Sequence, residues 1–132
     1  MRRRRRLRPH LVRRGELAVG DGTTFEIGPV QTHLVVEHGG TVTIGDRVTI
    51  GFGGGIACQS SIEIDDDVVL GPYVQLLDSA FHVTTSHRAR PEPRPIAIGA
   101  GAVLGAWTMV LPGGSVAAGE VVPPGTVVTA SR

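Results

Sequence analysis

The sequence predicts an all-β fold, a single-stranded parallel β-solenoid with about six triangular coils. The main observation is an aliphatic residue that returns at every sixth position toward the C-terminus, at Ile98, Leu104, Val110, Val116, Val122 and Val128. A period of six is neither the 3.6-residue repeat of a helix nor the alternation of a half-buried strand, and a short fixed period is typical of solenoids. Aromatic residues make up only 4% of the chain and glycine occurs 19 times, which suits a narrow aliphatic core with glycine at the corners.

The charge distribution divides the chain into a basic tail at residues 1–16 and one domain at residues 17–132. Eight of the thirteen arginines lie between residues 2 and 14, whereas all twelve acidic residues lie at or after Glu16. We expect the tail to be disordered and solvated, or alternatively to attract anionic partners. The rest of the chain carries five arginines against twelve acids, a net charge of −7, which argues against a nucleic-acid partner.

Cysteine usage and hydropathy indicate a compartment for the protein. A single cysteine, Cys58, excludes an intrachain disulfide and favours a reducing environment. No apolar run approaches the roughly 18 residues that span a bilayer, and no apolar segment follows the arginine-rich start. We therefore expect a cytoplasmic protein with no membrane partner.

The hexads become regular in the middle of the chain and are then interrupted. The repeat is loose from Val19 onward, and regular hexads begin at Ile44, Ile50, Ile56, Ile64, Leu70 and Leu76. Three hexads form one triangular turn, and successive turns stack about 4.8 Å apart. Between Phe81 and Ile98 the period disappears and three prolines occur within five residues. This segment predicts a loop extruded from the coil at about residues 82–97, where function is expected to lie.

A histidine near a carboxylate marks the start of that loop, in the sequence Asp78-Ser-Ala-Phe-His82. A histidine beside a carboxylate is suited to act as a general base near pH 7. The alternative is a loop histidine on the surface with no chemical role. Because His82 and His87 are five residues apart, a zinc enzyme of the γ-carbonic-anhydrase type is a further alternative, although no third histidine has a matching spacing.

Several segments together resemble a known family. They are Thr43-Ile-Gly-Asp-Arg-Val, Ile64-Asp-Asp-Asp-Val-Val-Leu-Gly-Pro-Tyr-Val, Asp78-Ser-Ala-Phe-His82, Pro95-Ile-Ala-Ile-Gly-Ala-Gly-Ala-Val-Leu-Gly-Ala and Val110-Leu-Pro-Gly. The chain is similar, from about Val19 to its end, to the hexapeptide-repeat acyltransferases, and most similar to the maltose, galactoside and polysaccharide O-acetyltransferases. The resemblance implies a left-handed parallel β-helix. It also implies a homotrimer with active sites between adjacent subunits.

The resemblance further implies an activity and its residues. His82 would act as the general base, Asp78 would orient its imidazole, and acetyl-CoA would be the co-substrate without any metal. Residues that match coenzyme-A-binding positions of the family are Gly105, Ala106, Pro124 and Thr129. The expected reaction is acetyl transfer to a hydroxyl group of a sugar or polysaccharide. The identity of the acceptor, the acyl group and the choice between O- and N-acylation are not encoded in a recognisable motif.

Three departures from the family pattern favour another alternative, a non-catalytic scaffold or degenerate acyltransferase. Pro124 stands where an amide donor is expected, and proline has none. Ala130 replaces a lysine that would meet a coenzyme A phosphate. The closing segment of the family is absent after Arg132, which predicts open strand edges at the C-terminal end.

Overall fold

The computed structural model describes residues 9–79 and 92–131, which form sixteen strands and no helix. All strand pairs in these ranges are parallel and belong to three sheets, here named A, B and C. Sheet A contains β1 (His10–Arg13), β4 (His33–Val36), β7 (Gly55–Cys58), β10 (Gln75–Leu77), β13 (Met109–Val110) and β16 (Val127–Val128). Sheet B contains β2 (Glu16–Val19), β5 (Thr41–Ile44), β8 (Ser61–Ile64), β11 (Ile96–Ile98) and β14 (Ser115–Val116). Sheet C contains β3 (Thr24–Phe25), β6 (Thr49–Ile50), β9 (Val69–Leu70), β12 (Val103–Leu104) and β15 (Val121–Val122).

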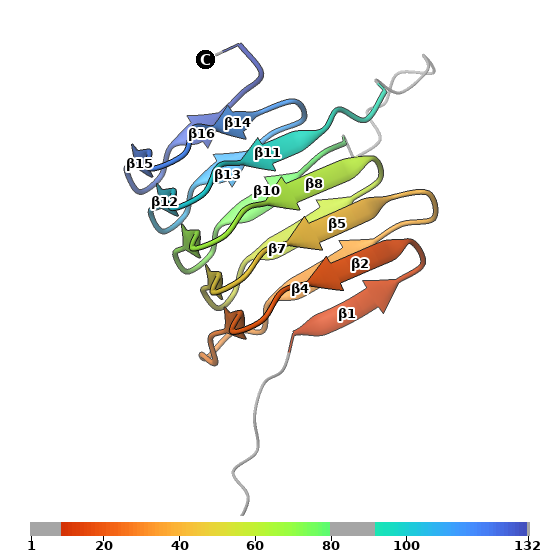
Figure 1. The fold of residues 1–132 in the computed structure, drawn as a ribbon, viewed down its shortest axis with the longest axis horizontal. Helices are drawn as coiled ribbons and strands as arrows, with labels where there is room; N and C mark the ends of the chain where they lie inside the picture. Colours follow the sequence, from red (N-terminus) through yellow and green to blue (C-terminus); the bar gives the residue numbers. More distant parts are fainter. Residues whose placement is uncertain (1–8, 80–91, 132) are drawn as a thin grey trace, which may run out of the picture.

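The chain winds through sheets A, B and C in turn, so that each coil contributes one strand to each sheet. In Figure 1 the strands β2, β5 and β8 run from right to left across the near face, and the chain returns from left to right behind them as it rises. A coil that rises in this sense is left-handed. Within the described residues there are five complete coils, and β16 begins a sixth. The strand register pairs Ile98 with Val116, Leu104 with Val122 and Val110 with Val128. The predicted left-handed β-helix with three hexads per coil is therefore confirmed.

The core consists of stacked aliphatic columns that the six-residue period places inside the prism. The first residue of each regular hexad is buried, and so is the small or branched residue four positions later in several hexads, for example Val48, Val68, Ala102 and Thr108. Outward residues alternate with these inward ones along β5 and β8. Each coil alone has a core only a few side chains wide, so most of its apolar burial comes from the coils above and below.

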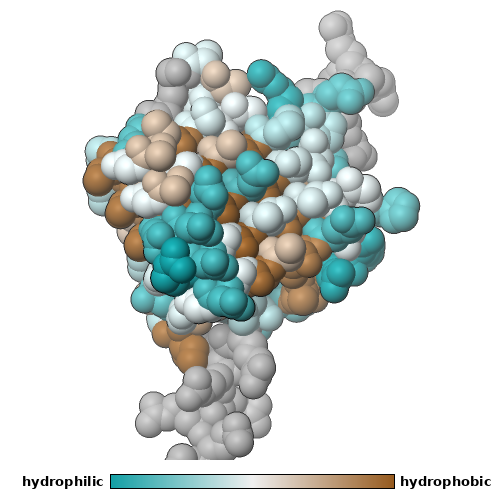
Figure 2. Space-filling model, in the orientation of Figure 1, coloured by the Kyte–Doolittle hydropathy of each residue, from teal (hydrophilic) through white to brown (hydrophobic). Residues whose placement is uncertain are grey.

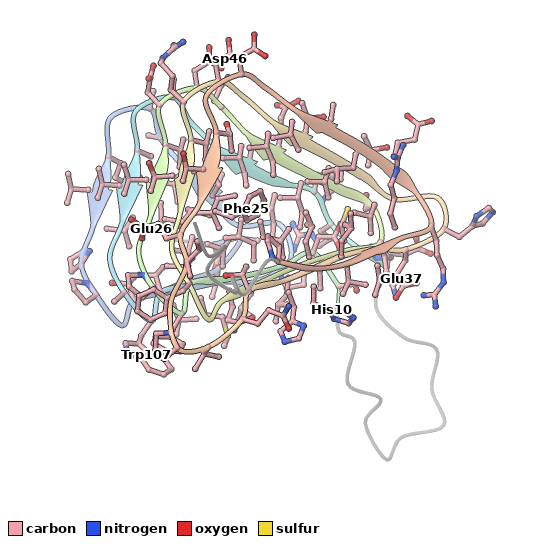
Figure 3. All side chains as sticks on the ribbon, turned by 90° about the horizontal axis from the view of Figure 1, so that it is seen from below. His10, Phe25, Glu26, Glu37, Asp46 and Trp107 are labelled. Atoms are coloured by element: carbon pink, nitrogen blue, oxygen red, sulfur yellow. The ribbon has the colours of Figure 1, made fainter. Side chains whose placement is uncertain are left out.

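The three corners of the prism differ in their side chains. The BC corner (residues 21–22, 46–47, 66–67, 100–101 and 118–119) uses aspartates to join coils. There the backbone N–H of Asp46 donates to Asp66 Oδ1 at 2.7 Å, and that of Asp21 donates to Asp46 Oδ1 at 2.8 Å. The CA corner comprises residues 52–53, 72–73, 106–107 and 124–125, and the AB corner comprises residues 37–40, 59–60, 78–79 and 112–114. Figure 3 shows Asp46, Trp107 and Glu37 at the three corners of the triangle.

Two boundaries differ from those expected. β1 lies within the segment predicted to be a tail, because its residues continue the ladder of sheet A and pair one-to-one with β4. The solenoid thus begins at His10, ahead of the predicted residue 17. The predicted loop at 82–97 ends earlier, because Ile96 already pairs with Ile62 in sheet B and points into the core. The described residues contain no helix that could cross a membrane.

The two ends of the solenoid also differ. At the C-terminal end the last inward residues of the three sheets, Val116, Val122 and Val128, are all buried. At the N-terminal end the corresponding residues Leu11 and Val19 are 49% and 44% exposed. The open apolar end of the described coils is therefore the N-terminal one, and β14, β15 and β16 are the terminal strands of their sheets at the other end.

Candidate functional site

Asp78 is fixed in the AB corner by the backbone of the preceding coil. Its side chain is completely buried, and its carboxylate accepts the N–H groups of Gln59 and Ser60, both at 2.7 Å. The backbone N–H of Asp78 donates to Ala57 O at 3.3 Å. The carboxylate thus satisfies two corner amides that have turned away from the strand ladder, which is the role that the BC aspartates perform near the surface.

Cys58 is the neighbour of Asp78 in the same inward column. Its Sγ lies 3.4 Å from Asp78 Oδ2 and 3.4 Å from Thr41 O. Burial, together with the negative charge of Asp78 and the hydrogen bond to it, raises the pKa of the Cys58 thiol to about 12. The thiol is therefore protonated at neutral pH and suited to donate, not to act as a nucleophile.

The chain leaves the coil after Ser79 and returns to the same corner at Arg94. The backbone N–H of Arg94 donates to Asp78 O at 2.8 Å, and the N–H of Gly113 donates to Arg94 O at 3.2 Å. Arg94 therefore occupies the ladder position between the coils of Asp78 and Gly113. Both ends of the excursion are held at one point of the AB corner. His82 and His87, which the sequence singles out, lie outside the described residues.

Ser79 adds an unsatisfied polar group at this point. Its residue is only 5% exposed, and within residues 9–79 and 92–131 its Oγ has no hydrogen-bond partner. A buried hydroxyl without a partner is costly, so this atom is suited to bind a group that comes from outside the described coils. Sequence reasoning did not identify Ser79, since a serine after a corner aspartate has no distinctive pattern.

Three of the four predicted coenzyme-A-binding residues lie together at the CA corner. A Cβ at Gly105 would lie 2.5 Å from Pro124 N, so these two residues are in direct contact between successive coils. Gly105 donates its N–H to Val122 O, and Ala106 accepts the N–H of Gly125. Thr129 lies apart from them, beyond β16, where its Oγ1 is 3.4 Å from Ser131 Oγ.

An aromatic column covers the CA corner and was not predicted. Tyr73 and Trp107 occupy equivalent positions in successive coils and stack with ring centroids 4.3 Å apart and an interplanar angle of 9°. Phe52 packs edge-on against Tyr73 at 5.5 Å. Trp107 is 66% exposed, and the next corner position holds Gly125, where an added Cβ would meet nothing within 4 Å. The signal in the sequence was that Tyr73 and Trp107 each stand two residues after a corner glycine, Gly71 or Gly105.

Asp78 and the three predicted coenzyme-A-binding residues Gly105, Ala106 and Pro124 thus fall on two different corners. Sheet A separates the AB corner at Asp78 from the CA corner at Gly105, and Figure 3 shows Trp107 at the end of this sheet opposite Glu37. Within the described residues, one chain does not bring Asp78 close to Gly105, Ala106 and Pro124. Within the part of the chain that the structure describes, no group of three histidine, cysteine or acidic residues could hold a metal ion.

The fold and this interrupted corner define the class of the protein, a left-handed parallel β-helix with a loop inserted between two coils. No model of a known protein family and no curated protein matches the chain. Among solved structures it is similar to a hexapeptide-repeat-containing acetyltransferase from Vibrio cholerae O1 biovar eltor, crystallised in complex with acetyl coenzyme A. The TM-score is 0.39 and the sequence identity 19%, over 94% of this chain and 67% of that chain.

Proposed function

We propose that the protein is a coenzyme-A-dependent acyltransferase that moves an acetyl group from acetyl-CoA to a hydroxyl group of a sugar or polysaccharide. The observation that carries the proposal is the anchored excursion at the AB corner. Asp78 and Arg94 hold its two ends, and His82 follows only four residues after the buried Asp78. A general base must be held within hydrogen-bond reach of the proton that it removes, and such an anchor limits where His82 can lie.

The proposed reaction needs one side chain that accepts and returns a proton, the imidazole of His82. A ring nitrogen of His82 accepts the proton of the acceptor hydroxyl while that oxygen attacks the thioester carbonyl of acetyl-CoA. The tetrahedral intermediate collapses, the carbon–sulfur bond breaks, and the imidazolium returns the proton to the leaving thiolate of coenzyme A. The products are an acetyl ester and coenzyme A. Asp78 acts here by fixing the start of the loop, since its carboxylate already accepts two backbone N–H groups.

Acetyl-CoA would lie along the CA corner, where Gly105, Ala106 and Pro124 meet. The exposed ring of Trp107 offers a flat apolar surface, and the absence of a side chain at Gly125 leaves the space beside that ring open. Such a surface suits the adenine ring or the pantetheine arm. Thr129, across sheet A, would belong to a different part of this site or to none.

A trimer would bring the two corners together, with the AB corner of one subunit facing the CA corner of the next. The outer face of sheet C supports such packing, because Val69, Val103 and Val121 form one exposed apolar column. Figure 2 shows apolar residues gathered along this edge of the molecule, over β9, β12 and β15. An exposed apolar face of this kind often marks a protein–protein contact.

An acetyl-transfer assay on His82→Ala tests the proposal, with His87→Ala as the matched control from the same segment. Purified protein is incubated with acetyl-CoA and a panel of sugars and polysaccharides, and release of the coenzyme A thiol is followed with and without a chelator. We expect His82→Ala to lose at least about 100-fold in rate, which is the usual contribution of a general base, and His87→Ala to retain activity. Equal loss in both variants together with inhibition by the chelator would favour a zinc enzyme. Unchanged turnover in His82→Ala would exclude this histidine as the base.

A further inference from the structure

At the N-terminal end of the described solenoid, core side chains remain partly exposed. A hollow of about 320 Å³ opens there, and its lining is almost entirely apolar: Pro9, Leu11, Leu17, Val19, Phe25 and Leu34. Figure 3 looks onto this end and shows Phe25 pointing into the triangle of strands. In the later coils of the described chain, the equivalent inward side chains are buried. Here Leu11 and Val19 remain about half exposed.

The backbone at this end is unpaired as well. Among the described residues, β1, β2 and β3 are the terminal strands of sheets A, B and C, and each pairs on one side only. An edge strand leaves every second N–H and C=O group without a strand partner, and this makes it a template for another chain. Another coil of a β-solenoid would both cover the exposed core side chains and pair with the strand edges.

We infer that a second copy of this chain covers the open end, head to head, across a two-fold axis. Both copies contribute the same surface, so the contact closes after two subunits and leaves no open apolar end. A head-to-tail stack would instead place this end on the C-terminal coil, where Val116, Val122 and Val128 are already buried. The asymmetry of the two ends therefore favours the closed dimer contact.

The strand register of the contact follows from β2. The N–H groups of Glu16 and Gly20 point toward β5 and donate to Gly40 O and Ile44 O. Because the direction alternates along a strand, the N–H groups of Leu17 and Val19 point toward the open edge. In an antiparallel pair these two residues can exchange hydrogen bonds, Leu17 with the partner's Val19 and the reverse. The two-fold axis then passes beside Ala18. The side chains of Leu17 and Val19 point into the prism, and the pairing would continue the core through the axis.

Charges at the corners fit this arrangement. A two-fold axis through the middle of sheet B places the AB corner of one copy over the BC corner of the other. The exposed Arg13 near the AB corner would then lie close to the partner's Asp21, which is exposed at the BC corner, whereas Arg14 pairs with Glu37 of its own chain. The same rotation places β1 over the partner's β3, so that Leu11 faces the partner's Phe25 and both fill the hollow.

A lipid surface is the competing occupant, because residues 1–8 carry six arginines and precede Pro9 at this end. Two observations disfavour it. Unpaired strand edges cannot enter the hydrocarbon region, where no water replaces the missing hydrogen bonds. The rim of the open end also carries the exposed acids Glu16, Asp21 and Glu26, which would repel anionic headgroups.

Disulfide trapping in the full-length protein tests the contact. Ala18 is exposed, and in the proposed register it lies opposite its own copy in a non-hydrogen-bonded pair, where Cα atoms are about 4.5 Å apart. Ala18→Cys should therefore form an intermolecular disulfide under mild oxidation. Thr43→Cys is the matched control, because Thr43 is the register neighbour of Ala18 one coil away from the open end. The native Cys58 is buried and its thiol has a raised pKa, so it does not compete.

The expected result is a cross-linked dimer in at least about half of Ala18→Cys and in almost none of Thr43→Cys. A second variant, Val19→Lys, should halve the mass of the native assembly in light scattering while its circular dichroism stays unchanged. Equal cross-linking of the two cysteine variants, or an unchanged mass for Val19→Lys, would overturn the inference. So would flotation of the wild-type protein with phosphatidylserine-containing vesicles that Val19→Lys abolishes, since the lipid would then be the occupant of this end.

Discussion

Asp78 illustrates how one side chain can support both the fold and the site. Its carboxylate is buried among the N–H groups of Gln59 and Ser60 and the thiol of Cys58. Sequence reasoning selected Asp78 for its distance from His82, and could not reveal that the carboxylate points back into the coil. That orientation depends on which corner amides lack strand partners, a property of stacked coils that no single hexad encodes.

Substitution of Asp78 by asparagine should therefore cost stability. An amide group has one acceptor oxygen and would direct an NH₂ group at a backbone N–H, so at least one buried donor loses its partner. We expect the free energy of unfolding in urea to fall by about 2–4 kcal/mol. Asp46→Asn is the matched control at the less buried BC corner, where the expected loss is about 1 kcal/mol or less. Similar losses in the two variants would contradict the proposed role of Asp78.

Cys58 makes a specific prediction for the pH dependence of stability. Its thiol pKa is raised from 9.0 to about 12 in the folded protein, so between these values the folded state holds a proton that the unfolded state has released. Stability from this residue is therefore complete below about pH 9 and is lost as the pH rises toward 12. Urea unfolding of the wild type and Cys58→Ala at pH 8 and pH 10.5 isolates the effect. The wild type should lose more stability between the two pH values; parallel losses would contradict a raised pKa.

At the scale of elements, the corners restrict the sequence more tightly than the strands do. Gly105 is packed so closely that a Cβ would lie 2.5 Å from the backbone nitrogen of Pro124. Gly119 has a φ of +73°, but a Cβ there would meet nothing within 4 Å. The two glycines therefore serve different purposes, close approach between coils at one and backbone conformation at the other.

Alanine at these two glycines should separate the two effects in thermal unfolding. Gly105→Ala forces two coils apart and should cost about 3 kcal/mol. Gly119→Ala should lower the free energy of unfolding by about 1–2 kcal/mol, because it only places an alanine in the left-handed backbone conformation. Equal melting temperatures for the two variants would mean that the coils at the CA corner can separate freely, and would remove the basis for a fixed binding surface at Gly105 and Ala106.

The regular hexads made most of the elements predictable from the sequence. From Ile44 onward, six-residue spacing placed the inward residues correctly, because three hexads match one turn of the triangle. β1 was missed because its partner β4 lies 23 residues away in register, as with His10 and His33, so the first coil does not share the later period. The aromatic column at the CA corner was missed for a related reason. Phe52 holds the first corner position, whereas Tyr73 and Trp107 hold the second.

At the scale of the whole molecule, the exposed faces predict assembly. The column Val69, Val103 and Val121 on sheet C should pack against a neighbouring subunit and give a trimer, or a hexamer if the open ends also pair. We expect Val121→Lys to lower the mass measured by light scattering, because it places a charge on the most exposed residue of the apolar column. Thr43→Lys, on the outer face of sheet B, serves as the control and should leave the mass unchanged. A monomeric wild type would leave the AB and CA corners apart and remove the inter-subunit site.

The central claim is that this β-helix uses acetyl-CoA. Calorimetric titration of the intact protein with acetyl-CoA, repeated with a chelator and with His82→Ala, tests it most directly. The proposed function predicts saturable binding that the chelator does not alter and that His82→Ala retains, because the histidine acts on the acceptor proton and not on coenzyme A. The absence of any binding heat at millimolar acetyl-CoA would contradict the claim and favour a non-catalytic scaffold.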